Sequence, residues 1–164
     1  MEIIQKISLI IGKLLNAIVG VLLALMTALI FAQVLGRFIF RNGLFWAEEL
    51  ARFSMVTMVF LGAALACKYK DHIKITILEE MLKGQILKIY RIIIALISIA
   101  FLSIVAYYGF SVLGVVSGQL SANMQISMNI VYMMIPIGAA IMILYLLIEI
   151  IEIIFPADKG EKTA

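Results

Sequence analysis

The sequence contains very few of the residues that build covalent or metal-bound sites. Its 164 residues include one cysteine, Cys67, and one histidine, His72. A single cysteine excludes an intrachain disulfide and any cysteine-based metal cluster, and a single histidine argues against a histidine metal site. No metal ion or cofactor is therefore expected. The net charge of +3 is small, and no nucleic-acid partner is expected.

Charged residues are also scarce. They make up 14% of the chain, whereas soluble domains contain ~25%. Hydrophobic residues make up 65%, and the mean hydropathy is +1.16. A soluble domain of this length could not bury so much apolar side chain, because small folds leave much of their surface exposed. The composition therefore predicts an integral membrane protein.

The uncharged runs set the number of membrane spans. A helix needs about 20 apolar residues to cross the hydrocarbon core, and the run from Leu14 to Gly36 is long enough. The run from Phe53 to Cys67 is too short, so the second span must begin earlier, near Trp46. The run from Ile92 to Ile148 can supply two spans, separated by the polar stretch 117–129. The predicted fold is an all-α membrane domain with four spans, at about 14–36, 46–67, 92–116 and 130–148.

Basic residues are unevenly distributed between the two sides of these spans. Of the 13 lysines and arginines, three lie on the side shared by the first and third loops, namely Arg37, Arg41 and Arg52. Because basic residues favour the cytoplasm, both termini are expected to be cytoplasmic. That orientation requires an even number of spans, which agrees with the four counted from hydropathy.

The basic loop between the second and third spans carries a helical pattern of its own. Apolar residues recur at helical spacing over residues 73–89, with charged residues between them. This pattern predicts a short amphipathic helix lying on the cytoplasmic face. His72 comes just before it and is expected to make an interfacial or capping hydrogen bond rather than to relay protons.

The stretch FWAEELARF places three charges at the start of the second span. Glu48 and Arg52 are four residues apart, and Glu49 and Arg52 are three apart, so all three can meet on one side of a helix. Trp46 suits the headgroup boundary, and Arg37 at the end of the first span lies at the same depth. Two interpretations remain open. The charges either form a self-satisfied helix start in the headgroup layer, or build a network that joins spans one and two and docks a second protein.

Small residues and one proline mark further positions within the spans. Gly62, Ala63 and Ala66 form a small-residue face on the second span, which allows another helix to approach closely. Packing within the four-helix unit is the favoured role for this face. Pro136 in the fourth span either kinks its helix or is simply tolerated there.

The segments around these features resemble a known family. RFIFRNGLFWAEELARF, then FLGAALACKYKDHIKI, and later YMMIPIG with Pro136, are similar to the small membrane subunit (DctQ type) of tripartite ATP-independent periplasmic (TRAP) transporters. The resemblance covers most of the chain, roughly residues 32–143. Its matching positions are Arg37, Trp46, Glu48, Glu49, Leu50, Arg52, Gly62, Ala63, His72 and Ile73.

The resemblance implies a role that composition cannot supply. Such a subunit is non-catalytic and braces a large, multi-span permease subunit among the lipids of the bacterial inner membrane. A periplasmic solute-binding protein delivers a carboxylate-bearing solute, and a sodium gradient drives its uptake. The ion and substrate sites are expected in the large subunit, so this chain does not reveal the solute.

Two other classes compete with a transporter subunit. One is a small four-span exporter that self-oligomerises, and the other is a small four-span membrane enzyme. Both require charged groups deep within a span. Glu48 and Glu49 lie too close to the end of their helix for that purpose. The sequence therefore favours a non-enzymatic subunit.

Overall fold

The computed structural model describes residues 2–39, 43–69 and 84–154, and within α1 it describes side chains from residue 8 onward. Its helices are α1 (Glu2–Ile39), α2 (Phe45–Tyr69), α4 (Gln85–Val116), α5 (Met128–Tyr132) and α6 (Met134–Ile154). Four segments are long and apolar enough to cross a membrane, namely Ser8–Ile39, Phe45–Tyr69, Gln85–Val116 and Met128–Ile154. The predicted all-α membrane class with four spans is thereby confirmed.

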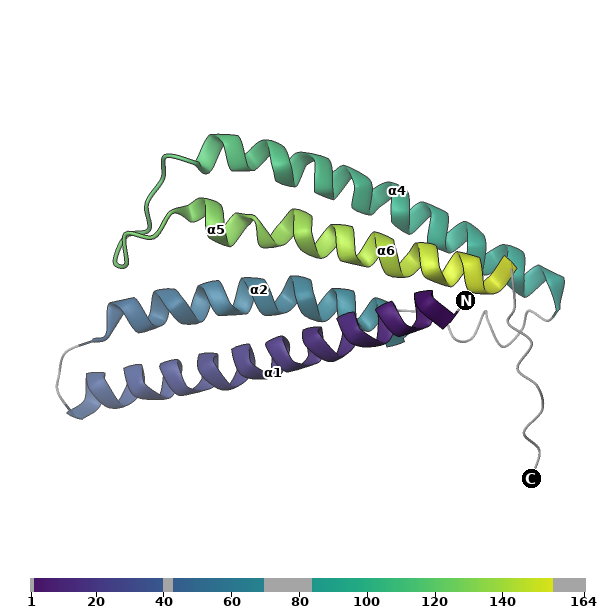
Figure 1. Cartoon of the computed structure of the whole chain (residues 1–164). Coiled ribbons are helices and arrows are strands. Elements are labelled where there is room, and N and C mark those ends of the chain that lie inside the picture. Colours follow the sequence, from purple (N-terminus) through teal and green to yellow (C-terminus); the bar gives the residue numbers. More distant parts are fainter. Residues whose placement is uncertain (1, 40–42, 70–83, 155–164) are drawn as a thin grey trace, which may run out of the picture.

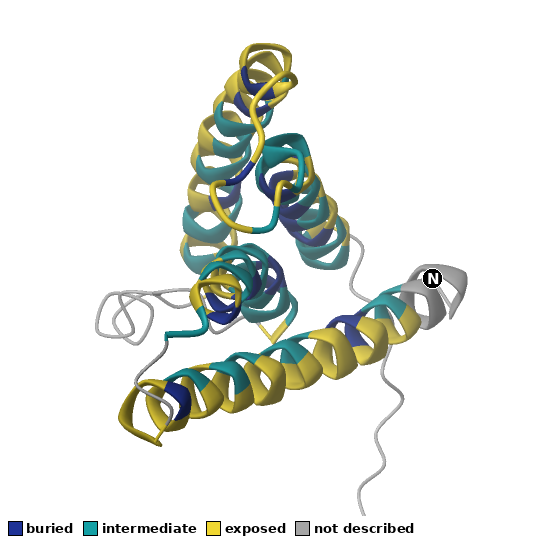
Figure 2. Ribbon diagram, turned by 90° about the vertical axis from the view of Figure 1, so that its left-hand side faces the viewer, coloured by how far each residue is buried: buried dark blue, intermediate teal, exposed yellow. Residues whose placement is uncertain are grey.

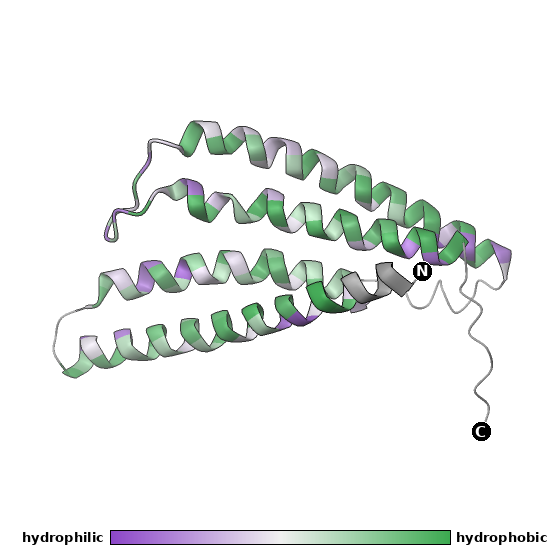
Figure 3. Cartoon of the chain, viewed as in Figure 1, coloured by the Kyte–Doolittle hydropathy of each residue, from purple (hydrophilic) through white to green (hydrophobic). Residues whose placement is uncertain are grey.

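The four spans form an open layer rather than a closed bundle. Their main contacts follow the order α1, α2, α6, α4, and Figure 1 shows the helices side by side in that order. α1 and α4 run in one direction, and α2 and the α5–α6 pair run in the other. The end at which α2 begins is called the Trp46 end below, and the opposite end the Tyr69 end. Hydrophobic residues cover most of every helix (Figure 3), as a hydrocarbon environment requires.

Burial is concentrated in the two central helices. In the most apolar part of each span, 28% of the residues are buried in α2 and in the α5–α6 span, against 6% in α1 and α4. Figure 2 shows the outer helices exposed over most of their surface. α1 contacts α2 through one stripe of alternating three- and four-residue steps, formed by Leu15, Val19, Leu22, Met26, Leu29, Gln33 and Gly36. Every other residue between Leu15 and Gly36 is exposed, so α1 is held along a single seam.

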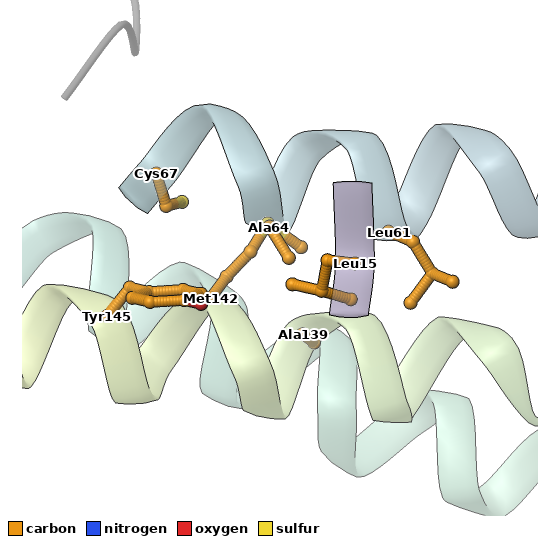
Figure 4. Close-up of a cluster of buried hydrophobic side chains, with 7 residues drawn as sticks. All are labelled: Leu15, Leu61, Ala64, Cys67, Ala139, Met142 and Tyr145. Atoms are coloured by element: carbon orange, nitrogen blue, oxygen red, sulfur yellow. The ribbon is translucent and has the colours of Figure 1, made fainter. Parts of the chain in front are cut away.

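The core lies where α2 and α6 approach each other, toward the Tyr69 end. Figure 4 shows its seven buried side chains, which are Leu15, Leu61, Ala64, Cys67, Ala139, Met142 and Tyr145. Ala64 and Ala139 are fully buried. A Cβ added at Gly138 would lie 2.8 Å from Phe60 Cβ and 3.2 Å from the Phe60 carbonyl oxygen. The absence of a side chain at Gly138 therefore sets the distance between α2 and α6.

Of the expected small-residue face of Gly62, Ala63 and Ala66, only part packs within the four-helix unit. A Cβ added at Gly62 would meet nothing within 4 Å. Its neighbour Ala63 does pack against the core, and Ala66 is half-buried. The close approach instead depends on Gly138, which the sequence pattern did not distinguish from other glycines.

The fourth span is interrupted at Met133, between α5 and α6. Pro136 has no N–H to donate to the carbonyl of Tyr132, and its ring crowds that carbonyl, which accounts for the break. Met133 N–H still donates to the Asn129 carbonyl at 2.9 Å. Pro136 is fully buried, and a Cβ added at Gly109 of α4 would lie 3.2 Å from its Cδ. The proline thus also packs against α4.

The ends of the helices differ from the expected ranges in all four spans, and the fourth span runs from Met128 to Ile154 rather than over 130–148. α1 extends beyond 14–36 in both directions, while α2 exceeds 46–67 by a residue or two at each end. Residues 85–89, expected to belong to the amphipathic helix over 73–89, are the first turn of α4, so the third span begins before Ile92. Residues 73–83 of that segment, and His72, lie outside the described residues. Gly84 precedes α4 with φ of 66°, a conformation that favours glycine.

Candidate functional site

Glu48 links the two N-terminal helices at the Trp46 end. Its Oε1 accepts a hydrogen bond from Arg52 Nη2 at 2.9 Å, which is also an ion pair one turn along α2. Its Oε2 accepts from Gln33 Nε2 of α1, again at 2.9 Å. Both carboxylate oxygens are therefore occupied, one by each helix. The arrangement joins α1 to α2 as expected, but through a glutamine rather than through a second arginine.

Gln33 is the member of this site that sequence reasoning missed. It lies on the α1 seam, between Leu29 and Gly36, where the other residues are apolar or glycine. A polar residue at one position of such a seam fixes the register of two helices, because it must find its partner to avoid an unsatisfied amide. The spacing from Leu29 and Gly36 is the signal that could have identified it.

Arg37 does not join this contact. It is exposed at the end of α1, whereas Glu48 forms its ion pair with Arg52. The expected four-residue charge network of Arg37, Glu48, Glu49 and Arg52 is therefore corrected to a smaller contact of Gln33, Glu48 and Arg52.

Glu49 turns away from Arg52 and binds the α4–α5 loop (residues 117–127). Its Oε2 accepts the backbone N–H groups of Asn123 at 3.0 Å and Met124 at 2.9 Å. Hydrogen bonds from backbone amides to a carboxylate are charge-assisted and short. The two adjacent carboxylates thus bind different elements. Glu48 is hydrogen-bonded to α1, and Glu49 is hydrogen-bonded to the loop that precedes the fourth span.

The α4–α5 loop is itself compact. Ser121 is 3% exposed, its N–H donates to the Ile126 carbonyl at 2.8 Å, and its hydroxyl accepts the Ile126 N–H at 3.1 Å. Gln125 has φ of 54°, which is uncommon for a residue with a side chain. Its Nε2 donates to the Ser121 carbonyl at 3.1 Å and so closes the turn. The loop that Glu49 binds therefore has a defined shape.

The depth of the charged pair follows from helix geometry. Trp46 is half exposed at the start of α2 and suits a membrane boundary. Lys68 follows 22 residues later, about 33 Å along an α-helix, which matches a hydrocarbon core of ~30 Å. Arg52 then lies about 9 Å inside the Trp46 boundary. The Arg52 side chain extends back toward that boundary, because its partner Glu48 lies one helical turn closer to Trp46.

An apolar groove of about 670 Å³ lies between α2 and α4, with α6 beneath it. Its walls include Phe60 of α2 and the face of α4 from Ile97 to Val105, and Met142 and Leu146 come from α6. Ile97–Val105 is close to the midpoint of α4. The groove therefore opens at the depth of the hydrocarbon core.

The fold and these contacts define a small multi-pass membrane protein whose outer helices remain largely uncovered. Among the described residues no group of three or more His, Cys, Asp or Glu side chains could hold a metal ion. Residues 26–155 match the family model described as the DctQ component of tripartite ATP-independent periplasmic transporters. The chain belongs to this family, which is a family of transporter components.

Curated relatives carry related names. A putative TRAP transporter small permease protein of Haemophilus influenzae is 36% identical over 44% of the chain and 45% of the relative. The C4-dicarboxylate TRAP transporter small permease protein DctQ of Vibrio cholerae is 32% identical over 46% of the chain and 33% of the relative. The sialic acid TRAP transporter permease protein SiaT of Haemophilus influenzae is 26% identical over 92% of the chain but 24% of the relative. The chain thus spans less than half the length of these three relatives.

Proposed function

We propose that this chain is a non-catalytic small permease subunit that braces a larger permease subunit in the bacterial inner membrane. The family match over residues 26–155 carries this proposal. The alignment with SiaT supports it, because nearly the whole chain corresponds to about a quarter of a much longer permease. The remainder of that permease has no counterpart in this chain. It indicates the kind of larger partner that this chain would need. The family match also favours this role over a self-oligomerising exporter or a membrane enzyme.

The open layer suits a bracing role. α1 and α4 have few buried residues, and the groove between α2 and α4 is apolar and open. Transmembrane helices associate through close packing and polar contacts. A layer with broad uncovered faces can place several helices against a partner at once, whereas a closed bundle would use those faces internally.

The proposed transport reaction is sodium-driven uptake of a carboxylate-bearing solute delivered by a periplasmic binding protein. The names of two relatives, one a sialic acid permease and the other a C4-dicarboxylate small permease, support an acidic solute. Sodium and solute would bind in the larger subunit. The orientation proposed from basic residues puts the Trp46 end and the α4–α5 loop on the periplasmic side, and the Tyr69 end on the cytoplasmic side.

The Glu48–Arg52 pair is the proposed polar contact with the larger subunit. The side chains are 48% and 70% exposed, so the pair contributes little by itself, ~0–1 kcal/mol. A partner that covers the pair would remove it from solvent, and breaking a buried pair costs ~3–5 kcal/mol. Substitution of Arg52 is therefore nearly neutral in the isolated subunit and strongly disruptive in the complex.

Co-purification of the two permease subunits tests this proposal. Arg52→Gln and Glu48→Gln should each reduce recovery of the larger subunit with a tagged small subunit, and solute uptake should fall in proportion. Arg37→Gln is the matched control, because Arg37 is an exposed arginine at the same end that lies outside the pair. Wild-type recovery for both pair variants would leave Glu48 and Arg52 as a helix start with no docking role.

Reconstitution of the chain alone tests the non-catalytic part of the proposal. Liposomes that contain only this subunit should take up no organic acid when a sodium gradient is imposed. Addition of the larger subunit and the binding protein should restore uptake. Specific uptake by the small subunit alone would instead identify it as a self-sufficient carrier.

A further inference from the structure

A second polar cluster joins α1 and α2 at the Tyr69 end. The side chain of Lys68 lies across α1 at Gly12, so close that a Cβ added at Gly12 would collide with its Cδ, Cε and Nζ. Gly12 itself is buried. The position of the lysine ammonium therefore depends on a glycine in the neighbouring helix.

Contacts place two donors of this cluster, Lys68 and Tyr69, next to each other. Lys68 Nζ lies 5.4 Å from the centroid of the Tyr69 ring, within range of a cation–π contact. The Tyr69 hydroxyl accepts a hydrogen bond from Asn16 Nδ2 at 3.1 Å, which leaves its own proton available to donate. Lys13 is exposed next to Gly12 and adds a second positive charge from α1. Within the described ranges, no carboxylate forms an ion pair with Lys68.

The cluster lies at a membrane boundary. Lys68 is about 33 Å along α2 from Trp46, which is close to the thickness of the hydrocarbon core, ~30 Å. When Trp46 occupies one boundary, Lys68 and Tyr69 reach the other, at the level of the lipid phosphates. In the orientation proposed above this is the cytoplasmic leaflet, whose surface is negatively charged in bilayers with anionic lipids.

We propose that Lys68, Tyr69 and Lys13 bind the phosphodiester headgroup of an anionic phospholipid of the cytoplasmic leaflet. Lys68 supplies a charge that Gly12 positions, and the Tyr69 hydroxyl supplies a directional hydrogen bond. The acyl chains lie along the exposed flank of α1 beyond Lys13, where most side chains are apolar. The lipid would thereby fill the boundary between α1 and α2. This site does not depend on the proposed transport function.

Native mass spectrometry of the detergent-solubilised full chain tests the site. Phosphatidylglycerol should bind in preference to phosphatidylcholine, and Lys68→Gln should weaken phosphatidylglycerol binding about fivefold, the effect of one lysine near an anionic surface. Lys68→Arg should retain binding, because the charge is kept. Lys88→Gln, at the Tyr69 end of α4, is the control for a general loss of positive charge and should bind as wild type.

A pair of glycine variants separates the site from general damage to α1. Gly12→Ala should displace Lys68 and weaken binding as Lys68→Gln does, whereas Gly20→Ala should not, because a Cβ there meets nothing within 4 Å. Tyr69→Phe should weaken binding without loss of charge. Circular dichroism of each variant verifies that the helices are intact.

Two results would overturn the proposal. One is equal phosphatidylglycerol binding by Lys68→Gln and Lys88→Gln, which would show that only overall charge matters. The other is displacement of the lipid by inorganic phosphate at equal concentration, which would make this a site for a free anion rather than for a phospholipid.

Discussion

Substitution of Gly138 by alanine should loosen the contact between α2 and α6. The added Cβ would lie 2.8 Å from Phe60 Cβ and 3.2 Å from the Phe60 carbonyl oxygen. Neither atom can move aside by a rotamer change, because one is backbone and the other is attached directly to it. The two helices must therefore separate, although the approach of α2 to α6 holds the core together.

Two opposing effects set how much Gly138→Ala changes the stability of the α2–α6 core. Replacing glycine by alanine within a helix stabilises it by roughly 0.5–1 kcal/mol. Forcing an extra methyl group into a packed contact costs ~1–3 kcal/mol. The packing cost outweighs the gain in helix stability, so a net destabilisation of about 1–2 kcal/mol is expected, which corresponds to a five- to thirtyfold change in an equilibrium constant.

The single cysteine of the chain provides the assay. Cys67 is 5% exposed and belongs to the α2–α6 core, so a maleimide reaches its thiol only when the core opens. In detergent, Gly138→Ala should raise the labelling rate of Cys67 by about five- to thirtyfold. Gly62→Ala is the matched control on α2, and it should label at the wild-type rate or slightly more slowly because a Cβ there is uncontacted.

The reasoning fails if the order of the two variants is reversed. Faster labelling in Gly62→Ala than in Gly138→Ala would put the close approach of helices at Gly62 after all. Wild-type labelling in Gly138→Ala would mean that α2 and α6 accommodate a methyl group without cost, and that glycine does not set their separation.

Three further predictions concern the loop, the α4–α6 contact and the topology. Glu49→Gln should accelerate amide hydrogen exchange in the α4–α5 loop, since a neutral amide is a weaker acceptor for its two N–H donors, whereas Glu48→Gln should leave that exchange unchanged. Gly109→Ala should lower the melting temperature relative to Gly114→Ala, because a Cβ at Gly109 lies 3.2 Å from the proline ring of α6 and one at Gly114 meets nothing within 4 Å. In a background without the native cysteine, Ala122→Cys should react with an impermeant thiol reagent only from the periplasmic side, and labelling only from the cytoplasm would reverse the proposed orientation.

Sequence alone predicted the class, the number of spans and the family resemblance. These follow from composition and from the lengths of uncharged runs. In hydrocarbon a helix satisfies its own backbone hydrogen bonds, and it must be about 20 residues long to cross the core. It also predicted that Glu48 pairs with Arg52 and that α2 begins near Trp46, since both depend on spacing within one helix. Local patterns of this kind are fixed before any two helices meet.

Tertiary structure decided which residues meet between helices. It paired Glu48 with Gln33 instead of Arg37, and it gave Glu49 to a loop more than 70 residues away in the chain. It also put a close approach of α2 and α6 at Gly138, whereas Gly62 of the expected small-residue face meets nothing within 4 Å. In a chain that is apolar on almost every face, hydrophobic patterning does not tell which face of a helix meets a neighbour. That choice depends on shape, on small residues and on the few polar groups that require a partner.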